Sequence, residues 1–339
     1  NANATCVINF DAAEGYLLGE PNKGMSAMFT FINESRLGVA VQGQAHIETS
    51  FQGAVAYARE RLQMRAPQRA RPELPADPII VHPDVRRMLL TQKAFGDGGR
   101  VLNYHCALLS DLSHRGDAEQ RQMAQTMLAL LTPIAKGFLT EAAMEATQNG
   151  VQVLGGHGYI REWGMEQEYR DARITAIYEG TNTIQALDLL GRKILASGGQ
   201  LLAPFISEIS RFCAAQHPDE CQPFIQTLAA ASDLWVQLTQ EIGARAQKDP
   251  NAVGAAAFDY LLLAGYTTLA YCWARSASVA ATKLAAGGDF DAAFLRAKVS
   301  TARFYFERLL PRTQTLAVTI RSSSENLMAL DDEAFIRGV

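Results

Sequence analysis

One acidic residue stands where a catalytic base could work. Glu179 lies in the run Ile177–Gln185, on a short glycine-containing turn just ahead of a segment with helical periodicity. A carboxylate on such a turn is held by backbone and not by a long flexible loop, so it can be aimed at a substrate proton, as general base catalysis requires. The same residue could instead simply favour the dipole at the start of the helix. The pattern by itself leaves both interpretations open.

A glycine-rich segment precedes this turn. Residues 152–159 read Gln-Val-Leu-Gly-Gly-His-Gly-Tyr, and Gln152 stands 27 positions before Glu179 (179 − 152 = 27). Glycines let a backbone approach a ligand closely, but such turns also simply reverse the chain between helices. No strand precedes the segment, so it is not the dinucleotide-binding fingerprint. His157, inside the segment, is assigned no catalytic role.

Together the two segments closely resemble the C-terminal helical domain of the acyl-CoA dehydrogenases, flavoenzymes of fatty-acid oxidation. The run Tyr169–Ile174 between them also resembles that family. The resemblance implies that Glu179 removes the α-proton of an acyl-CoA thioester. It also implies that Tyr178 and Gly180, beside the base, lie at the substrate.

The resemblance further implies FAD as the cofactor, held mainly by a neighbouring subunit. A third matching segment, Tyr57–Gln63, places Arg61 where the family has an arginine on the FAD pyrophosphate. A guanidinium suits bidentate contact with phosphate. The chain departs from the family at Met64–Arg65, where Phe-Gly is usual. The implied cofactor contacts are Arg61, Gln63, Gln152, Gly155, Gly156, Thr181 and Thr183.

Two residues keep two interpretations. Arg36 lies 25 positions before Arg61 (61 − 36 = 25), which matches a family arginine near the catalytic centre and implies a place at the substrate. It also fits a solvated arginine on a helix. Thr181 fits a contact with the flavin pyrophosphate or a helix cap, and one hydroxyl does not easily do both. Some family members carry their base just before the arginine, where this chain has Ser35, which favours Glu179.

Composition excludes several classes of function. The 339 residues are 19% charged with a net charge of −4, so the chain lacks the basic surface that nucleic acid demands. Five cysteines without a Cys-x-x-Cys pair, and histidines without ligand spacing, argue against a metal site. This cysteine usage favours a reducing cytoplasm. The apolar run Val253–Trp273 is long enough to span a membrane, but Asp259 in its middle favours a buried bundle helix.

Helical periodicity dominates the chain. Residues 24–62 predict one long helix, with a break near Gly43 or Gly53 as an alternative. A Pro/Arg-rich loop follows, and Pro83–Asp84 suit the start of the next helix. Pro133 is expected to kink or divide a third helix, and Asn149–Gly150 to end it. This third helix is predicted over about 117–149. A short helix is expected over 162–170, and the next begins at about Thr181 or Asn182, with Gln185 as the capping-box partner of Asn182. Further helical segments are predicted over 200–216, 220–247, 251–286, 289–309 and 311–321.

These elements predict a mainly α protein with three parts. Residues 4–19 alternate as one or two short strands would, so residues 1–22 are interpreted as the remnant of the middle β-domain that family members carry. Residues 23–196 are predicted to form the acyl-CoA dehydrogenase four-helix bundle. Residues 197–339, after the linker Ser197–Gly199, are predicted to form a second helical bundle. A subset of the family carries such an additional domain, and the run 179–193 of this chain resembles that subset. The expected role of the additional domain is packing and dimer contacts.

Three functions remain open at this point. The resemblance implies the C-terminal portion of an FAD-dependent acyl-CoA dehydrogenase, a homo-oligomer (dimer or tetramer) that passes electrons to an electron-transfer flavoprotein. An acyl-CoA oxidase, which uses oxygen, shares the scaffold. A non-catalytic helical assembly module is the third. Much of the family's substrate pocket comes from domains absent here, so residues 1–339 alone are expected to fold, stay colourless and lack activity.

Overall fold

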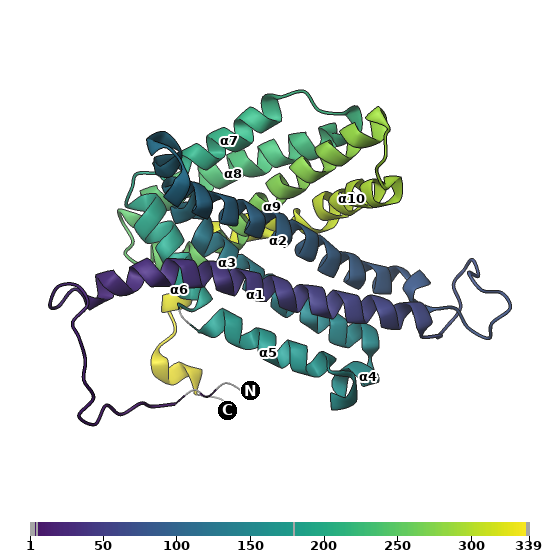
Figure 1. Cartoon of the computed structure of the whole chain (residues 1–339), viewed down its shortest axis with the longest axis horizontal. Coiled ribbons are helices and arrows are strands. Elements are labelled where there is room, and N and C mark those ends of the chain that lie inside the picture. Colours follow the sequence, from purple (N-terminus) through teal and green to yellow (C-terminus); the bar gives the residue numbers. More distant parts are fainter. Residues whose placement is uncertain (1–3, 5, 179, 337–339) are drawn as a thin grey trace.

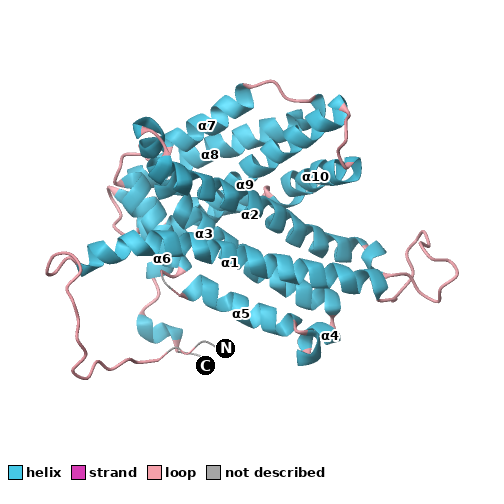
Figure 2. Ribbon diagram, in the orientation of Figure 1, coloured by secondary structure: helices cyan, strands magenta, loops and turns pink. Residues whose placement is uncertain are grey.

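Helices make up almost the entire framework of the protein in the computed structural model, which describes residues 4, 6–178 and 180–336. Figure 2 shows helices joined by loops, and the described residues contain no strand. The predicted mainly α fold is confirmed. In chain order the helices are α1 (Gly24–Glu60), α2 (Pro83–Arg115), α3 (Ala118–Leu154), α4 (Gly156–Tyr159), α5 (Met165–Ile177), α6 (Asn182–Leu187), α7 (Ala203–Ala214), α8 (Gln222–Ala246), α9 (Ala252–Ala286), α10 (Ala292–Phe304), α11 (Arg312–Arg321) and α12 (Glu325–Met328). π-helical stretches, Asp188–Leu195 and Tyr305–Leu309, continue α6 and α10.

The first bundle consists of α1, α2, α3 and the shorter α5, which lie side by side (Figure 1). Local signals set the helix starts as predicted. α2 begins at Pro83, whose missing N–H is harmless in the first turn. α3 begins after Asp117, which forms a reciprocal capping box with Gln120. Pro133 lies inside α3 and does not divide it.

Close packing, and not chain reversal, explains two glycines of this bundle. α3 passes Asn149–Gly150, its predicted end, and continues to Leu154. A Cβ on Gly150 would stand 2.2 Å from the Ser50 hydroxyl oxygen on α1. α1 likewise runs unbroken past Gly43, where a Cβ would stand 3.0 Å from a backbone oxygen of α3. The predicted helix end and the alternative break are therefore wrong, because these glycines let α1 and α3 approach each other.

The second half of the chain packs around α9. This helix contacts α2, α3 and α6 of the first half and α8, α10 and α11 of the second. The buried Trp273 donates its indole N–H to the carbonyl of Ala94 on α2 at 3.0 Å. Phe95, Phe138 and Tyr266 bring their rings together where α2, α3 and α9 meet. One hydrophobic core therefore runs through both halves.

The strands predicted over residues 4–19 are not formed. The described residues of this segment have irregular backbone and are all exposed, including Val7 at 92% and Tyr16 at 91%. The segment runs outside the helical body (Figure 1). Two short strands are marginal without further strands to pair with, which is why the alternation alone does not produce them here. The β-domain origin of this segment and the division at Ser197–Gly199 stay predictions.

Two helices within the described residues are long and apolar enough to cross a membrane by length and composition alone. They are α3 and α9, and 78% and 67% of their most apolar windows are buried inside the protein. Core helices pass the same test, so the finding is weak evidence for a membrane span. α9, which contains Val253–Trp273, packs as a bundle helix.

Candidate cofactor and active site

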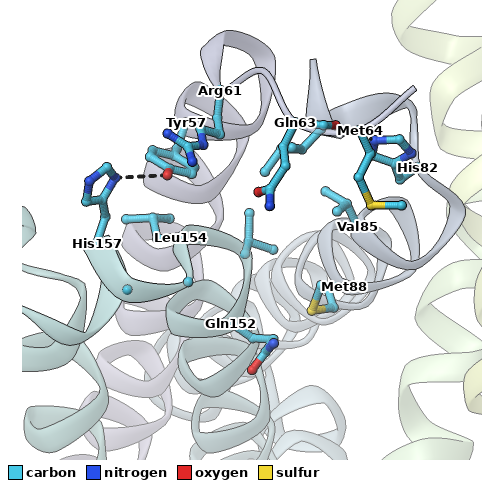
Figure 3. A pocket seen from close by; sticks show the side chains of 14 residues that line it. Tyr57, Arg61, Gln63, Met64, His82, Val85, Met88, Gln152, Leu154 and His157 are labelled. Carbon is cyan, nitrogen blue, oxygen red and sulfur yellow. Dashed lines mark hydrogen bonds between the residues drawn. The ribbon is translucent and has the colours of Figure 1, made fainter. Parts of the chain in front are cut away.

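A cavity of about 620 Å³ opens between the C-terminal ends of α1 and α3 and the start of α2 (Figure 3). It brings together five of the seven predicted cofactor residues, namely Arg61, Gln63, Gln152, Gly155 and Gly156. Their segments are far apart in the sequence. Apolar side chains complete the lining, and they are Met64, Ile79, Val85, Met88, Val153 and Leu154. The cavity thus combines a few polar side chains with a largely apolar lining.

Backbone hydrogen bonds hold the segment that follows α1 at the edge of the cavity. The carbonyl of Arg61 accepts a hydrogen bond from the N–H of Ile79 at 2.8 Å. The N–H of Gln63 donates to the carbonyl of Asp77 at 3.0 Å, and Nε2 of His82 lies 2.9 Å from the carbonyl oxygen of Gln63. The exposed side chains of Arg61 and Gln63 are therefore presented from a fixed backbone.

The three glycines after α3 have two different roles. Gly155 ends α3 with a φ of 59°, a left-handed conformation that suits glycine. A Cβ on Gly155 or Gly156 would meet no atom within 4 Å, so the backbone there is open to a ligand. A Cβ on Gly158 would stand 2.4 Å from the carbonyl oxygen of Val151. The first two glycines expose backbone, and the third allows close packing.

An aromatic cluster braces this end of the cavity, and sequence reasoning missed it. The hydroxyl of Tyr57 lies 2.9 Å from Nδ1 of His157, whose ring stacks on Trp163 with centroids 4.6 Å apart. Tyr57 also meets Trp163 edge to face at 5.3 Å. Tyr57 and His157 line the cavity. No local pattern links a residue of α1 to one in the glycine-rich segment, so this contact could not be predicted from the sequence.

The charge of the cavity suits an anionic group. Arg61 is the one arginine or lysine among the described residues that line it, and a guanidinium can bind phosphate in bidentate fashion. Arg59, two residues earlier, is exposed and does not line the cavity. Within the described part of the chain, no three His, Cys, Asp or Glu side chains are grouped so as to hold a metal ion.

The residues predicted for the substrate side gather at the far end of α5. Glu179 itself lies outside the described residues, so its neighbours define the turn. The hydroxyl of Tyr178 donates to the side-chain oxygen of Gln42 on α1, and burial raises the pKa of Tyr178. Gly180 has a φ of 72°, and a Cβ there would stand 2.4 Å from Nε2 of Gln185. Both its conformation and its surroundings therefore require glycine.

Arg36 is buried at this turn. Its exposed fraction is 5%, and its Nη1 lies 3.6 Å from Oδ2 of Asp188. Its Nη2 lies 3.5 Å from the position of a Cβ on Gly180. Nε of Arg36 has no hydrogen-bond partner among the described residues. The alternative of a solvated helix arginine is wrong, whereas contact with a substrate stays a prediction.

Thr181 caps α6. Its hydroxyl oxygen accepts the N–H three residues later at 3.3 Å, which leaves the O–H free to donate. The predicted capping pair of Asn182 and Gln185 is wrong, because the side-chain nitrogen of Gln185 donates to the carbonyl of Gly180 at 3.1 Å. Thr183 is exposed. Neither threonine lines the cavity at the other end of α5.

The structure therefore separates the predicted residues into two groups. α5 has 13 residues, so it is about 20 Å long at 1.5 Å per residue. The glycine-rich segment and α4 lie at its start, and the turn before α6 lies at its end (Figure 1). A single ligand would need to be extended to reach both groups, unless two ligands serve them.

Sequence reasoning also missed Lys136. This residue of α3 has no exposed surface, and its ammonium donates to the carbonyl of Gly180 at 3.0 Å. A signal was available, because Lys136 is the one charged residue in the stretch 130–139. Counting an apolar stripe along a helix passes over such a residue.

Two family models divide the chain between them. Residues 22–195, about half of the chain, match the acyl-CoA dehydrogenase C-terminal domain. Residues 205–331 match a model described as acetyl-CoA dehydrogenase C-terminal like.

Curated proteins are similar over nearly the whole chain. The 3-methylmercaptopropionyl-CoA dehydrogenase of Ruegeria pomeroyi is 40% identical over 334 residues, which are 96% of this chain and 55% of that protein. The broad-specificity linear acyl-CoA dehydrogenase FadE5 of Mycobacterium tuberculosis is 32% identical and covers 98% of this chain and 57% of its own. The chain thus spans about half the length of the curated relatives it matches.

A solved structure has the same fold. The acyl-CoA dehydrogenase of Bacillus anthracis, complexed with FAD, matches with a TM-score of 0.68 at 19% identity. The match covers 92% of this chain and 53% of that one. At this level of identity the likeness shows the fold alone.

Proposed function

Since this chain belongs to the acyl-CoA dehydrogenase family, we propose that it is the helical C-terminal portion of an FAD-dependent enzyme that oxidises an acyl-CoA thioester between its α and β carbons. One observation carries the proposal. The residues that match the family's cofactor contacts come from two distant segments, around Arg61 and around Gln152, and they line one cavity. Chance similarity in either segment alone would not bring them together.

The residues of the cavity fit part of FAD. Arg61 would bind the pyrophosphate, and the open backbone at Gly155–Gly156 would let the cofactor approach closely. Gln63 and Gln152 offer hydrogen bonds beside the apolar lining. When bound, FAD supplies the acceptor for the hydride that leaves the β carbon.

Proton transfer is assigned to Glu179. Its carboxylate would take the α-proton, and the electron pair left behind would conjugate with the thioester carbonyl. Backbone N–H groups of the turn would stabilise the negative charge on that oxygen. Tyr178 and Gly180 flank the base, and Arg36 lies against Gly180. The fixed positions of these neighbours support the assignment, because a general base must be held in place.

Thr181 and Thr183 are assigned to the cofactor that serves this turn. Thr181 uses an oxygen lone pair to cap α6 and keeps its O–H for a phosphate oxygen. Thr183 is exposed in the first turn of α6. Its hydroxyl would donate a hydrogen bond to the cofactor where the cofactor covers that turn.

The assembly proposed here is a homo-oligomer, either a dimer or a tetramer. The cavity lined by Arg61 is open and lies about one α5 length away from the turn of Glu179. A cofactor bound mainly by a second copy could therefore complete it. The five free cysteines support a reducing compartment, for which the cytoplasm is proposed.

The decisive experiment is the substitution Glu179→Gln in the flavin-loaded enzyme. We expect turnover of acyl-CoA to fall by roughly 10²- to 10⁴-fold, the range that a general base contributes, with flavin content unchanged. Glu166→Gln is the control, because Glu166 forms an ion pair with Arg170 on the surface of α5. Anaerobic bleaching of the flavin by a panel of acyl-CoA thioesters measures the step. Unchanged bleaching in Glu179→Gln would reject the assignment.

Two further measurements separate the alternatives. Hydrogen peroxide formed during turnover would indicate an acyl-CoA oxidase, whereas reduction of an electron-transfer flavoprotein supports the proposed dehydrogenase. Residues 1–339 purified alone should be folded, colourless and inactive. A folded protein that gains neither flavin nor activity when the rest of the enzyme is supplied would support a non-catalytic assembly module.

A further inference from the structure

Lys136 is a charged side chain in the middle of an apolar core helix. It has no exposed surface, and its neighbours on α3, Ala135 and Phe138, are buried as well. Taking an ammonium out of water is unfavourable unless strong hydrogen bonds replace the water. A well-packed apolar residue often serves stability at least as well as a buried charge. The charge therefore calls for a role other than stability.

The ammonium of Lys136 is bonded to the turn that precedes α6. It donates to the carbonyl of Gly180 at 3.0 Å and to Oδ1 of Asn182 at 2.8 Å. Because lysine only donates, Asn182 must present its oxygen to Lys136. The amide nitrogen of Asn182 then donates to Thr140 Oγ1 at 2.9 Å and to Glu141 Oε1 at 2.7 Å. A connected network on α3 thus holds one side of the turn.

Other bonds hold the residues on both sides of position 179. The carbonyl of Gly180 also accepts from Nε2 of Gln185 at 3.1 Å, so two donors engage its oxygen. On the other side, the N–H of Tyr178 donates to the carbonyl of Ile174 at 3.0 Å, and the Tyr178 hydroxyl donates to Gln42. Position 179 therefore lies between two anchored residues, and Lys136 supplies the charged anchor.

We propose that Lys136 is a positioning residue for the reaction. By fixing the peptide of Gly180, it holds the turn so that the carboxylate of Glu179 and the turn's N–H groups keep their reactive geometry. This inference rests on the proposed function. It acts through the backbone of the turn, where a displacement of about 1 Å can lower a rate by about 10²-fold.

The test compares Lys136→Met with Lys298→Met. Lys298 on α10 is a partly buried lysine that is ion-paired with Asp97 on α2 at 2.9 Å, so it is a matched control for losing an ammonium. In the flavin-loaded enzyme, Lys136→Met should lower kcat by about 10²-fold with KM within about threefold. Lys298→Met should leave both constants within about twofold. Lys136→Gln keeps a neutral hydrogen-bond donor, so its kcat should lie between those of Lys136→Met and the wild type. This variant replaces Lys136→Met in the test if Lys136→Met does not fold.

Amide hydrogen exchange of the full chain supplies a readout that does not depend on turnover. In Lys136→Met, the amides of residues 178–185 should exchange at least about tenfold faster, while those of α9 keep their protection. Unchanged kcat together with unchanged exchange in the turn would overturn the proposal. So would a loss of protection spread evenly over the protein, since that is the mark of a purely structural lysine. If Glu179→Gln keeps full turnover but the turn still loosens in Lys136→Met, the proposed function fails and the anchor stands.

Discussion

The ring of Phe138 on α3 packs directly against Gly265 on α9. A Cβ on Gly265 would stand 2.1 Å from Cδ2 of the ring, and 2.2 Å from Cγ. Phe138 is also in edge-to-face contact with Tyr266, the next residue on α9, at 4.9 Å between centroids. This contact joins the first half of the chain to the second, because α3 and α9 belong to different halves.

The substitution Gly265→Ala should therefore destabilise the protein. Overpacking a filled core costs roughly 1–3 kcal/mol, and the better helix propensity of alanine, about 1 kcal/mol, offsets only part of this. Gly254→Ala is the control on the same helix, since a Cβ there would meet no atom within 4 Å. Gly254→Ala should leave the free energy of unfolding unchanged or raise it by up to about 1 kcal/mol. Urea unfolding followed by circular dichroism measures both, and equal changes would contradict the packing argument.

Arg312 on α11 forms a second link between the halves. Its guanidinium binds both carboxylate oxygens of Glu145 on α3 at 2.7 and 2.8 Å, and it donates to the hydroxyl of Tyr266. The two side chains are 37% and 33% exposed, so solvent screens the pair in part. We expect Arg312→Gln to lower the free energy of unfolding by about 1–2 kcal/mol, between the values for surface and buried pairs. The control Arg87→Gln breaks the exposed ion pair with Asp84 and should change the free energy of unfolding by less than about 0.5 kcal/mol. A loss of the same size in both variants would show that Arg312 adds nothing beyond a surface ion pair.

Local signals predicted those parts of the fold that local interactions decide. Pro83 identified the start of α2 correctly, because a proline in the first turn involves only near neighbours. The start of α3 near Asp117 was also predicted, and the structure adds the capping box that fixes it. The glycines misled for the opposite reason. Gly150 looks like a helix end in the sequence, but its role depends on Ser50, a hundred residues earlier (150 − 50 = 100). No local pattern contains that information.

The candidate site divides along the same line. Matching segments predicted Arg61, Gln152 and Gly155, and the structure brings them to one cavity. Lys136 had a signal of its own, a single charge in an apolar stretch, but its hydrogen bonds to the carbonyl of Gly180 and to Asn182 join segments that are distant in the sequence, so no local pattern predicted them. The same holds for the contact of Tyr57 with His157. Residues that bind a ligand can be found by type and spacing, whereas residues that hold them in place depend on tertiary contacts.

The carboxylate of Asp77 orders the loop beside the cavity, and we expect this ordering to be lost in acid. The carboxylate has no exposed surface and accepts hydrogen bonds from the N–H groups of Ala66 and Arg71 and from Nε of Arg69. Burial alone would raise the pKa of Asp77, but these donors outweigh burial and hold the pKa below its ordinary value of 3.8. A depressed pKa contributes stability that is present above pH 3.8 and is lost as the pH falls through the lower folded value.

Hydrogen exchange of residues 62–78, corrected for the intrinsic effect of pH, measures this loss. Protection should hold above about pH 4 and decline only below the unfolded value of 3.8. At neutral pH, Asp77→Asn should loosen the same residues. The carboxylate accepts from its three donors through two charged oxygens, whereas an amide has a single neutral acceptor oxygen. Glu73→Gln, in the same loop but with a side chain 62% exposed, should have no effect. If protection of the loop were the same in Asp77→Asn and wild type, the carboxylate would not be what orders it.

Arg61 should govern the affinity for flavin. It follows the end of α1 and lines the cavity, whereas Arg59, on the last turn of the same helix, is exposed and does not. Charge-assisted hydrogen bonds contribute about 1.5–3 kcal/mol each, so Arg61→Ala should raise the Kd for FAD by roughly 10- to 100-fold. Arg59→Ala should stay within about twofold, since it removes a similar charge without touching the cavity. Titration of flavin-depleted enzyme with FAD, followed by quenching of flavin fluorescence, gives both constants. Salt partly screens a phosphate contact. The difference in Kd for FAD between Arg61→Ala and Arg59→Ala should therefore decrease as the ionic strength rises. Equal affinity in the two variants at low salt would place the pyrophosphate elsewhere, and the cavity would then have to be reassigned.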